Sequence, residues 1–469
     1  MRARATLAAL TFAGALAFCA SPAFANDGAT TVQCGQTLTH SVKLANDLTD
    51  CPSNGLIIGA DGITVDLNNH KIDGVQADCG GELVPVGIDN GGFDGVTIEN
   101  GTVRQFDVGI KATDVNDSRV DHLTVRDNLS GGIDFEGIFQ SGHPPTGNRV
   151  DHNDVSGDRC GSAINLFING EGNRFDHNRV RDAQTGISVC CGPATEPNVI
   201  EDNSVAHVGN FGILVFAAGV ARVERNDLVD IGSGDDGCAP LINCIGINVG
   251  GDSSGTVIHD NTITRSWNAG IAVDTCFDCG GPTHLMTGVR ISDNTLASTG
   301  DGIWLIDTDR DVVTRNTVTG AGTFGSPSAL GLGVLLNGVG DTEVSRNAIT
   351  DSGRGVAPGI LIGVPPPFPT SQRPVDGNVV VRNSVSRQRA DGILVAPVAQ
   401  DTTLERNTAD RNAGDGINVV SPSTTITRNT ADDNGTYGIQ AVQGVTDGGN
   451  NEASGNGGPA QCTVTVACS

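Results

Sequence analysis

Two carboxylates two positions apart give the clearest chemical signal in the sequence. Asp134 and Glu136 lie in the short segment Gly132-Ile133-Asp134-Phe135-Glu136. On a β-strand both side chains would share one face, roughly 6–7 Å apart. That separation suits acid/base cleavage of a glycosidic bond or oxygen ligands for Ca²⁺, and an ordinary solvated strand face can carry such a pair as well.

A lysine is expected beside this pair. Lys111 follows Gly109-Ile110, the preceding copy of the same motif, and should therefore lie one strand spacing from Asp134. If the protein is an enzyme, we predict Lys111, Asp134 and Glu136 as its catalytic residues. Lys111 would be an electrostatic clamp and the two acids an acid/base pair, or alternatively Ca²⁺ ligands.

Four further side chains are expected on the same face as substrate-binding residues. They are Asp89, Asn165, Phe167 and Trp304. We expect Trp304 at the far end of a groove, where its indole ring would stack on a sugar.

A recurring Gly-Ile dipeptide predicts the strands that must position these residues. Each copy opens a segment of three to five alternating, β-branched residues, which is typical of a strand. With the isoleucine pointing inward, the next residue points outward. The copies begin at Gly87, Gly109, Gly132, Gly186, Gly212, Gly246, Gly270, Gly302, Gly359, Gly392, Gly416 and Gly438.

A second motif, apolar-x-x-Asn-x-apolar, recurs between these strands. Three strands in about 22 residues, repeated about fourteen times, predict a parallel solenoid in which each coil pairs with the next. We expect the asparagines to adopt the left-handed conformation of a tight corner and to bond to one another along the stack. The repeated positions are Asn100, Asn128, Asn153, Asn178, Asn203, Asn226, Asn261, Asn294, Asn316, Asn347, Asn383, Asn407 and Asn429.

The repeats between Val96 and Ile439, with the segment from Ala60 to Gly74 before them, resemble a known group. This group is the right-handed parallel β-helix proteins of the pectate-lyase-like superfamily, particularly those with NosD-type repeats. The resemblance implies an all-β, three-sheet solenoid. It leaves the function open, because the superfamily includes lyases, hydrolases, epimerases, phage-tail fibres and coils without known activity. The Gly-His-Gly segment of its hydrolases and the Asp-Pro-His segment of alginate epimerases are missing here.

The charge balance disfavours one class of partner. The chain of 469 residues has 28 basic and 54 acidic side chains, a formal net charge of −26. Unspecific nucleic-acid binding needs a basic surface, so we expect no nucleic-acid partner. The longest apolar run after residue 25 is too short to span a bilayer, so we expect no transmembrane segment.

Residues 1–25 are expected to be an export signal, because Arg2 and Arg4 precede an apolar run and an Ala23-Phe24-Ala25 cleavage site. The rest, 26–469, is predicted to be one secreted β-helix domain, with first coils at 26–95, repeat coils at 96–440 and a C-terminal cap at 441–469. Export favours disulfides, and we expect Cys34 to pair with Cys51. Cys462 and Cys468 could pair only if the segment between them turns.

Two histidines, His152 and His177, each stand directly before a repeated asparagine. Their rings should therefore stack in adjacent coils. Two stacked imidazoles could hold a metal ion, whereas the neighbouring Asp151 and Asp176 favour a surface hydrogen-bond ladder.

Together these patterns predict a secreted β-helix that binds an extracellular polysaccharide. If the protein is an enzyme, we expect a lyase, hydrolase or epimerase that cleaves or epimerises the polymer along a groove from Asp89 to Trp304. The alternative is a non-enzymatic cell-surface, adhesion or structural β-helix. Ca²⁺ is the one cofactor that the residues suggest, and the sequence specifies neither the sugar nor the oligomeric state.

Overall fold

The computed structural model describes residues 28–75, 85–138, 143–158, 160–168, 170–192, 194–232, 238, 243–274, 285–327, 329–354, 357–364, 373–463 and 465–469. The expected export signal at 1–25 lies outside these residues. Within them there is no helix, and hence no apolar helix long enough to cross a membrane.

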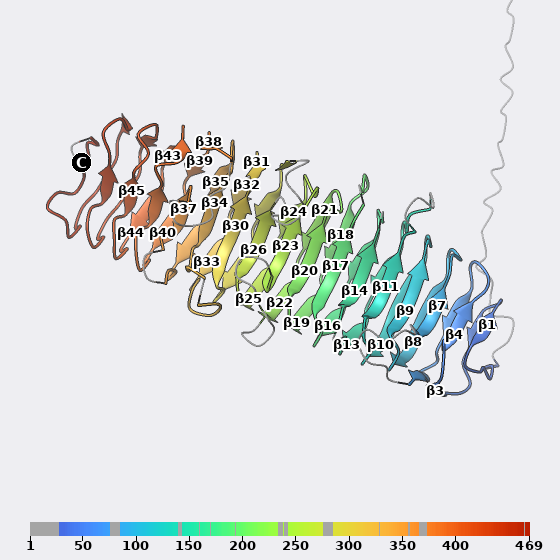
Figure 1. The fold of residues 1–469 in the computed structure, drawn as a ribbon. Coiled ribbons are helices and arrows are strands. Elements are labelled where there is room, and N and C mark those ends of the chain that lie inside the picture. The colour runs from blue at the N-terminus through green and yellow to red at the C-terminus, as the bar shows by residue number, and fades with distance from the viewer. Residues whose placement is uncertain are drawn as a thin grey trace, which may run out of the picture.

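Short strands stack along an elongated solenoid, with β1 at one end and the C-terminus at the other (Figure 1). Strands opened by the Gly-Ile motif make up twelve of the sixteen strands of one parallel sheet, called here the Gly-Ile sheet. About fourteen coils were expected from the asparagine motif; β1 and β4 add coils that carry no copy of it. The strands of this sheet are β1 (Gln36–Leu38), β4 (Leu56–Ile58), β7 (Val86–Asn90), β9 (Val108–Thr113), β11 (Gly131–Glu136), β14 (Ser162–Phe167), β17 (Thr185–Cys190), β20 (Phe211–Phe216), β23 (Ile245–Gly250), β26 (Ala269–Asp274), β30 (Asp301–Ile306), β34 (Val334–Asn337), β37 (Ile360–Ile362), β41 (Ile393–Val395), β45 (Ile417–Val419) and β47 (Ile439–Ala441).

Two further parallel stacks complete each coil, and they share the long bent strands β8 and β10. The second stack consists of β2 (Val42–Lys43), β5 (Thr64–Asp66), β8 (Thr97–Arg104), β10 (Arg119–Arg126), β12 (Arg149–Asp151), β15 (Arg174–Asp176), β18 (Asn198–Glu201), β21 (Ala221–Glu224), β24 (Val257–His259), β28 (Arg290–Ser292), β32 (Val312–Thr314), β35 (Glu343–Ser345), β39 (Val379–Val381), β43 (Thr403–Glu405), β46 (Thr425–Thr427) and β48 (Thr446–Gly449). The third stack adds β3 (Leu48–Cys51), β6 (Lys71–Gly74), β13 (Asp154–Ser156), β16 (Arg179–Arg181), β19 (Ser204–Val208), β22 (Asp227–Ile231), β25 (Thr262–Ser266), β29 (Thr295–Ala297), β33 (Thr317–Thr319), β36 (Ala348–Thr350), β40 (Ser384–Ser386) and β44 (Thr408–Asp410). Two small pairs lie outside them, β27 (Met286–Thr287) with β31 (Thr308–Asp309) and β38 (Val375–Asp376) with β42 (Ala399–Gln400).

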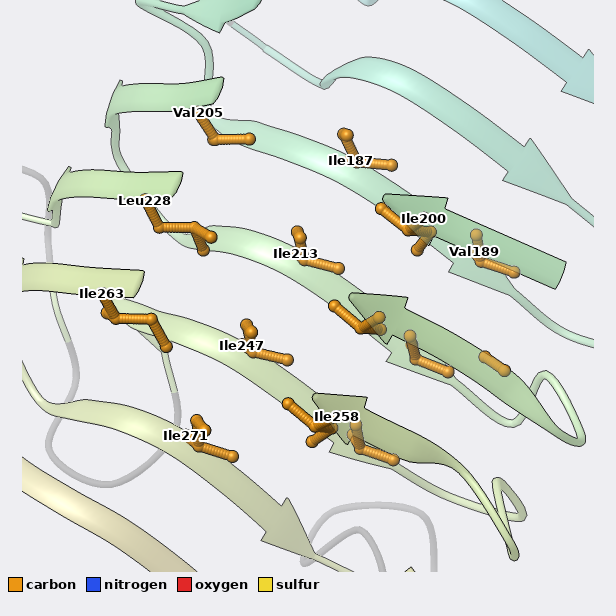
Figure 2. Close-up of a cluster of buried hydrophobic side chains, with 14 of the residues drawn as sticks. Ile187, Val189, Ile200, Val205, Ile213, Leu228, Ile247, Ile258, Ile263 and Ile271 are labelled. Atoms are coloured by element: carbon orange, nitrogen blue, oxygen red, sulfur yellow. The ribbon is translucent and has the colours of Figure 1, made fainter. Parts of the chain in front are cut away.

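The core is a stack of branched aliphatic side chains inside the coils (Figure 2). Ile187, Ile213 and Ile247 lie one above another on the Gly-Ile sheet and are fully buried. The glycine before each isoleucine is needed because a neighbouring side chain packs against it. A Cβ on Gly186 would meet the Gly212 carbonyl oxygen at 2.4 Å and a Val205 methyl at 2.6 Å. Glycine therefore recurs before the isoleucine because a larger residue would not fit against the neighbouring coil.

Asparagines form a continuous ladder at the corner between the second and third stacks. Each amide nitrogen donates to the amide oxygen one coil further on and to a backbone carbonyl one coil back, as Asn316 does to Asn347 at 3.0 Å and to Ile291 at 2.9 Å. Every ladder side chain is buried, so its polar atoms are satisfied within the fold. The members are Asn153, Asn178, Asn203, Asn226, Asn261, Asn294, Asn316, Asn347, Asn383, Asn407, Asn429 and Asn451.

Two details of the ladder correct the sequence interpretation. Asn100 and Asn128 are not members, because Gly101 and Leu123 occupy the equivalent positions in their coils. The left-handed conformation belongs to the residue before each ladder asparagine, such as His152 at φ 57°, and not to the asparagine itself.

Disulfides close both ends of the solenoid. The predicted Cys34–Cys51 bond is confirmed, with its Cα atoms 5.5 Å apart. Cys462 pairs with Cys468, whose Cα atoms are 6.1 Å apart, so the segment between them does turn. Cys238–Cys244 and Cys190–Cys191 are bonded as well. Disulfides of this number are typical of an oxidising compartment and indicate a non-cytoplasmic location.

The ladder yields a stability prediction. In the Asn316→Ala variant, the buried backbone N–H of Asn294 and the carbonyl of Ile291 lose their partners. We expect the free energy of unfolding to fall by about 3 kcal/mol, since each unsatisfied buried group costs roughly 1–3 kcal/mol. Urea denaturation followed by circular dichroism measures this loss. Thr317→Ala, at an exposed neighbouring position, is the control, and an equal effect of both substitutions would contradict the role of the ladder.

Candidate functional site

Two parallel lanes of outward side chains run along the N-terminal half of the Gly-Ile sheet. In the first lane the register places Asp89, Lys111, Asp134 and Asn165 on consecutive strands β7, β9, β11 and β14. The second lane lies two residues further along each strand. Its members are Thr113, Glu136, Phe167, Cys190 and Phe216 on β9, β11, β14, β17 and β20.

The predicted catalytic residues lie together in these lanes. The Lys111 Nζ atom is 2.7 Å from Glu136 Oε2, in an ion pair with about a third of each side chain exposed. Asn165 donates from its amide nitrogen to Asp134 Oδ1 at 2.9 Å. Asp89 lies one coil before Lys111 and accepts a hydrogen bond from Asn54 at 3.1 Å. The two acids thus have different partners, an amide for Asp134 and an ammonium group for Glu136.

Asp134 lies on the outward face of its strand, as expected, but it is partly buried there. Burial raises its pKa to about 6; the negative charge of Glu136 adds to this rise, and the Asn165 hydrogen bond and Lys111 oppose it. A carboxyl group with this pKa is substantially protonated in mildly acidic solution, so it can act as a general acid.

Lys111 remains a cation. Burial acts to lower its pKa, but the hydrogen bond and charge of Glu136, together with the charges of Asp134 and Asp89, raise the pKa above its ordinary value. A lysine held protonated in this way suits charge stabilisation and not proton abstraction.

At Asp134 and Glu136, Lys111 would compete with a Ca²⁺ ion for its ligands. Lys111 Nζ contacts the Glu136 oxygen that an ion would need. No three His, Cys, Asp or Glu side chains among the described residues are arranged to hold a metal ion. Ca²⁺ usually takes six to eight oxygen ligands.

An apolar surface continues the second lane beyond Glu136. Phe167 is 38% exposed, and Phe216 lies two coils further on. Between the two rings lies the Cys190–Cys191 disulfide, which joins adjacent residues and is partly exposed. The outward position predicted for Phe167 is confirmed, whereas the sequence gave no signal for this disulfide. A polar lane thus lies beside an apolar one.

The expected exposure of Trp304 is wrong. Its side chain is only 1% exposed and belongs to a second apolar cluster on the outer face of the Gly-Ile sheet, with Leu332, Leu335 and Leu361. The segment before β34 folds over this face, where Ser326 donates its backbone N–H to the Trp267 carbonyl. Strand alternation correctly put Trp304 on the outer face, but an insertion covers it, so the predicted groove does not reach Trp304.

Asp301 helps to hold this cover in place. Its buried carboxylate accepts the backbone N–H of Leu332 at 2.6 Å, and burial raises its pKa to about 6 against the opposing hydrogen bonds. We assign it a structural role, which the sequence did not reveal.

A hollow of about 300 Å³ lies beside the second lane, next to Thr113. No motif in the sequence indicated this hollow, because it lies among the segments that follow β7, β9 and β11. Its two aspartates are engaged with backbone N–H groups, Asp94 with Asn116 at 2.7 Å and Asp114 with Ile138 at 2.6 Å. The lining residues are Gly91, Gly92, Asp94, Thr113, Asp114, Asn116, Ile138 and His143.

Comparison with known proteins identifies one matching family. The family described as "Right handed beta helix region" matches residues 86–242 and 245–457. A comparison with curated protein sequences finds no match.

Among solved structures, one similar chain is the A-module of mannuronan C-5 epimerase AlgE4 from Azotobacter vinelandii. The two sequences are 12% identical, the match covers 84% of this chain and 91% of that chain, and the TM-score is 0.44. For a double mutant of the periplasmic alginate epimerase AlgG, the identity is 13%, the coverage 80% and 76%, and the TM-score 0.43. DFA-IIIase from Arthrobacter chlorophenolicus A6 in complex with GF2 has 12% identity, 64% and 69% coverage, and a TM-score of 0.42. These likenesses concern the fold alone.

The raised pKa of Asp134 leads to a prediction for Asp134→Asn. The folded protein binds this proton more tightly than the unfolded chain, whose carboxyl has a pKa near 3.8. The resulting stabilisation is present below pH 3.8 and is lost as the pH rises through about 6. The variant should therefore gain stability relative to the wild type between pH 4 and about 6.5. Urea midpoints of both proteins across this range test it; a difference that does not change with pH would contradict it.

Proposed function

This chain belongs to the right-handed β-helix family, and from that premise we propose that it binds an extracellular polysaccharide along the Gly-Ile sheet, from Asp89 to Phe216. The observation that carries the proposal is the pairing of a polar lane with an apolar lane on one exposed surface. The polar lane holds Lys111, Asp134 and Asn165. The apolar lane holds Phe167, the Cys190–Cys191 disulfide and Phe216.

A polysaccharide matches this surface better than other polymers do. A sugar ring has hydroxyl groups around its edge and an apolar face, so it can bond to one lane while stacking on the other. The chemistry repeats from coil to coil at the strand spacing of about 4.8 Å, which suits an extended polymer lying along the solenoid. A nucleic acid would be repelled by a chain of net charge −26.

The same lanes contain the groups for acid/base chemistry on a bound polymer. Asp134, with its raised pKa, would donate a proton to the oxygen of the bond that breaks. In cleavage, Glu136 would act as the base that takes a proton from the attacking water. In epimerisation, Glu136 would take the proton of a ring carbon and Asp134 would return a proton to that carbon. Lys111 would stabilise negative charge on the Glu136 carboxylate or on the substrate. This pair serves cleavage or epimerisation, and the proposed enzymatic activity belongs to one of these two classes.

One observation favours the second candidate, a non-enzymatic adhesion or structural β-helix. Glu136 is already paired with Lys111, and Asp134 with Asn165, so the groups satisfy one another without a ligand. In that case the lanes would bind a polymer without changing it, or bind none.

A glycan array combined with a product-release assay on the purified protein tests the proposal. We expect Phe167→Ala to weaken binding about ten-fold, because an aromatic contact of this kind contributes roughly 1–1.5 kcal/mol. The control is Asn418→Ala, at a first-lane position near the C-terminal end of the Gly-Ile sheet, where the amide nitrogen donates to Asp391. Its binding should equal that of the wild type. Equal binding by the Phe167 and Asn418 variants, or no binding to any glycan, would overturn the proposed surface.

The enzymatic part has its own test. The double variant Asp134→Asn with Glu136→Gln should keep binding within a few-fold and lose turnover by about 100-fold or more, as general acid/base groups contribute 10²–10⁴. Binding without product formation by the wild type would support the non-enzymatic candidate. Full turnover by the double variant would place the reaction elsewhere.

A further inference from the structure

Three consecutive coils carry the same four-residue pattern at the corner of the second stack. The pattern is arginine, an apolar residue, aspartate and histidine, and it occupies Arg119–His122, Arg149–His152 and Arg174–His177. The register of β10, β12 and β15 aligns the three copies position by position. This corner is separate from the lanes of the Gly-Ile sheet.

The register stacks the three imidazole rings. The His122 and His152 ring centroids are 5.0 Å apart with the planes 2° from parallel, and the His152 and His177 centroids are 4.9 Å apart at 7°. The side chains are 56%, 45% and 48% exposed. The predicted stacking of His152 and His177 thus includes a third ring, that of His122.

Each ring is oriented by a carboxylate beneath it. The Nδ1 atoms of His122, His152 and His177 lie 2.9 Å from oxygens of Asp121, Asp151 and Asp176, respectively. All three aspartates are buried. The hydrogen-bond ladder that the sequence suggested at His152 and His177 is therefore present, but its carboxylates are inside the surface and only its rings are exposed.

Arginines from the preceding coil pair with two of these carboxylates. Arg119 makes two hydrogen bonds to Asp151, at 2.9 and 2.8 Å, and Arg149 makes the same pair to Asp176, at 3.0 and 2.8 Å.

A carboxylate that already accepts two hydrogen bonds from an arginine also accepts the one from the histidine, so Nδ1 is the donor in His152 and His177. In the neutral ring the lone pair is then on Nε2, at the exposed side. A histidine whose other nitrogen donates to a carboxylate is the usual arrangement of a metal ligand, because it fixes the ring and raises the basicity of the binding atom.

We propose that two adjacent rings of this column bind one divalent transition metal ion through their Nε2 atoms, with water completing the coordination. His152 is common to both pairs, so the column holds one ion at a time, between His122 and His152 or between His152 and His177. Imidazole nitrogen suits Zn²⁺, Cu²⁺ and Ni²⁺. No three ligating side chains converge on a point in the described part of the chain, so the site uses two protein ligands.

The spacing allows such an ion once two adjacent rings turn toward each other. Parallel rings held alike place their Nε2 atoms about as far apart as their centroids, at 4.9–5.0 Å. A tetrahedral ion with bonds of about 2.0–2.1 Å holds two nitrogens roughly 3.4 Å apart. Each Nε2 atom therefore moves inward by under about 1 Å, and both rings also turn out of their parallel planes so that their in-plane lone pairs meet at the ion. The exposed rings have room for this tilt.

Calorimetric titration of the full-length protein with Zn²⁺ at pH 7.5 tests the site. The three histidines have positive φ, between 52° and 57°, so asparagine is the right replacement; Asn100 already occupies the same column at φ 62°. His152→Asn breaks both pairs, whereas His122→Asn and His177→Asn each leave one pair. We expect His152→Asn to weaken binding about ten-fold or more, because the ion keeps one ligand of two. At least one of the other two variants should bind like the wild type.

The control is His207→Asn, at φ 54°, whose ring is exposed and has no stacked partner among the described residues. It should leave Zn²⁺ binding unchanged. Anomalous diffraction from Zn²⁺-soaked crystals should show a peak beside His152. The two-ring site would be overturned if His152→Asn bound Zn²⁺ like the wild type, or if the anomalous peak lay elsewhere. It would also be overturned if all four variants lost affinity equally, or if His122→Asn, His152→Asn and His177→Asn did so. Equal unfolding temperatures of the variants and the wild type verify the fold.

Discussion

The coil-to-coil register of the parallel strands is the constraint on which the rest of the structure depends. The asparagine ladder stabilises it, because each buried amide bonds to the next coil through both its backbone and its side chain, as Asn153 does to Asn178. The sequence separation along the ladder varies from 22 to 36 residues without breaking it. Insertions therefore leave the coils as loops while equivalent positions remain one strand spacing apart.

Because of this register, equivalent side chains of successive coils line up and form continuous surfaces. Lys111 and Glu136 form an ion pair only because β9 and β11 are aligned residue by residue. The same alignment places Phe167 and Phe216 on one lane, and it stacks three histidines at another corner. A linear polymer and a two-ring metal site are both natural partners for such repeats, since each needs similar groups at regular spacing.

Much of this could be predicted from the sequence, because register in a solenoid follows from local motifs. The Gly-Ile copies predicted the Gly-Ile sheet and brought Lys111, Asp134 and Glu136 together, as the structure shows. Long-range packing was not predictable. Trp304 has the right alternation for the outer face, but a covering segment buries it. Asn100 matched the asparagine motif yet occupies the left-handed position before the ladder, because the motif does not distinguish these adjacent positions. The Cys190–Cys191 bond and the hollow beside Thr113 depend on side-chain geometry, which the spacing of motifs in the sequence does not determine.

The central claim is that the paired lanes of the Gly-Ile sheet form a polysaccharide-binding surface. A crystal structure of the protein with an oligosaccharide that it binds tests this claim most directly. We predict sugar density running across β9, β11, β14 and β17, with one ring stacked on Phe167 and hydroxyl groups bonded to Asp134 or Asn165. Density confined to the second or third stack, or to the C-terminal half of the solenoid, would contradict it.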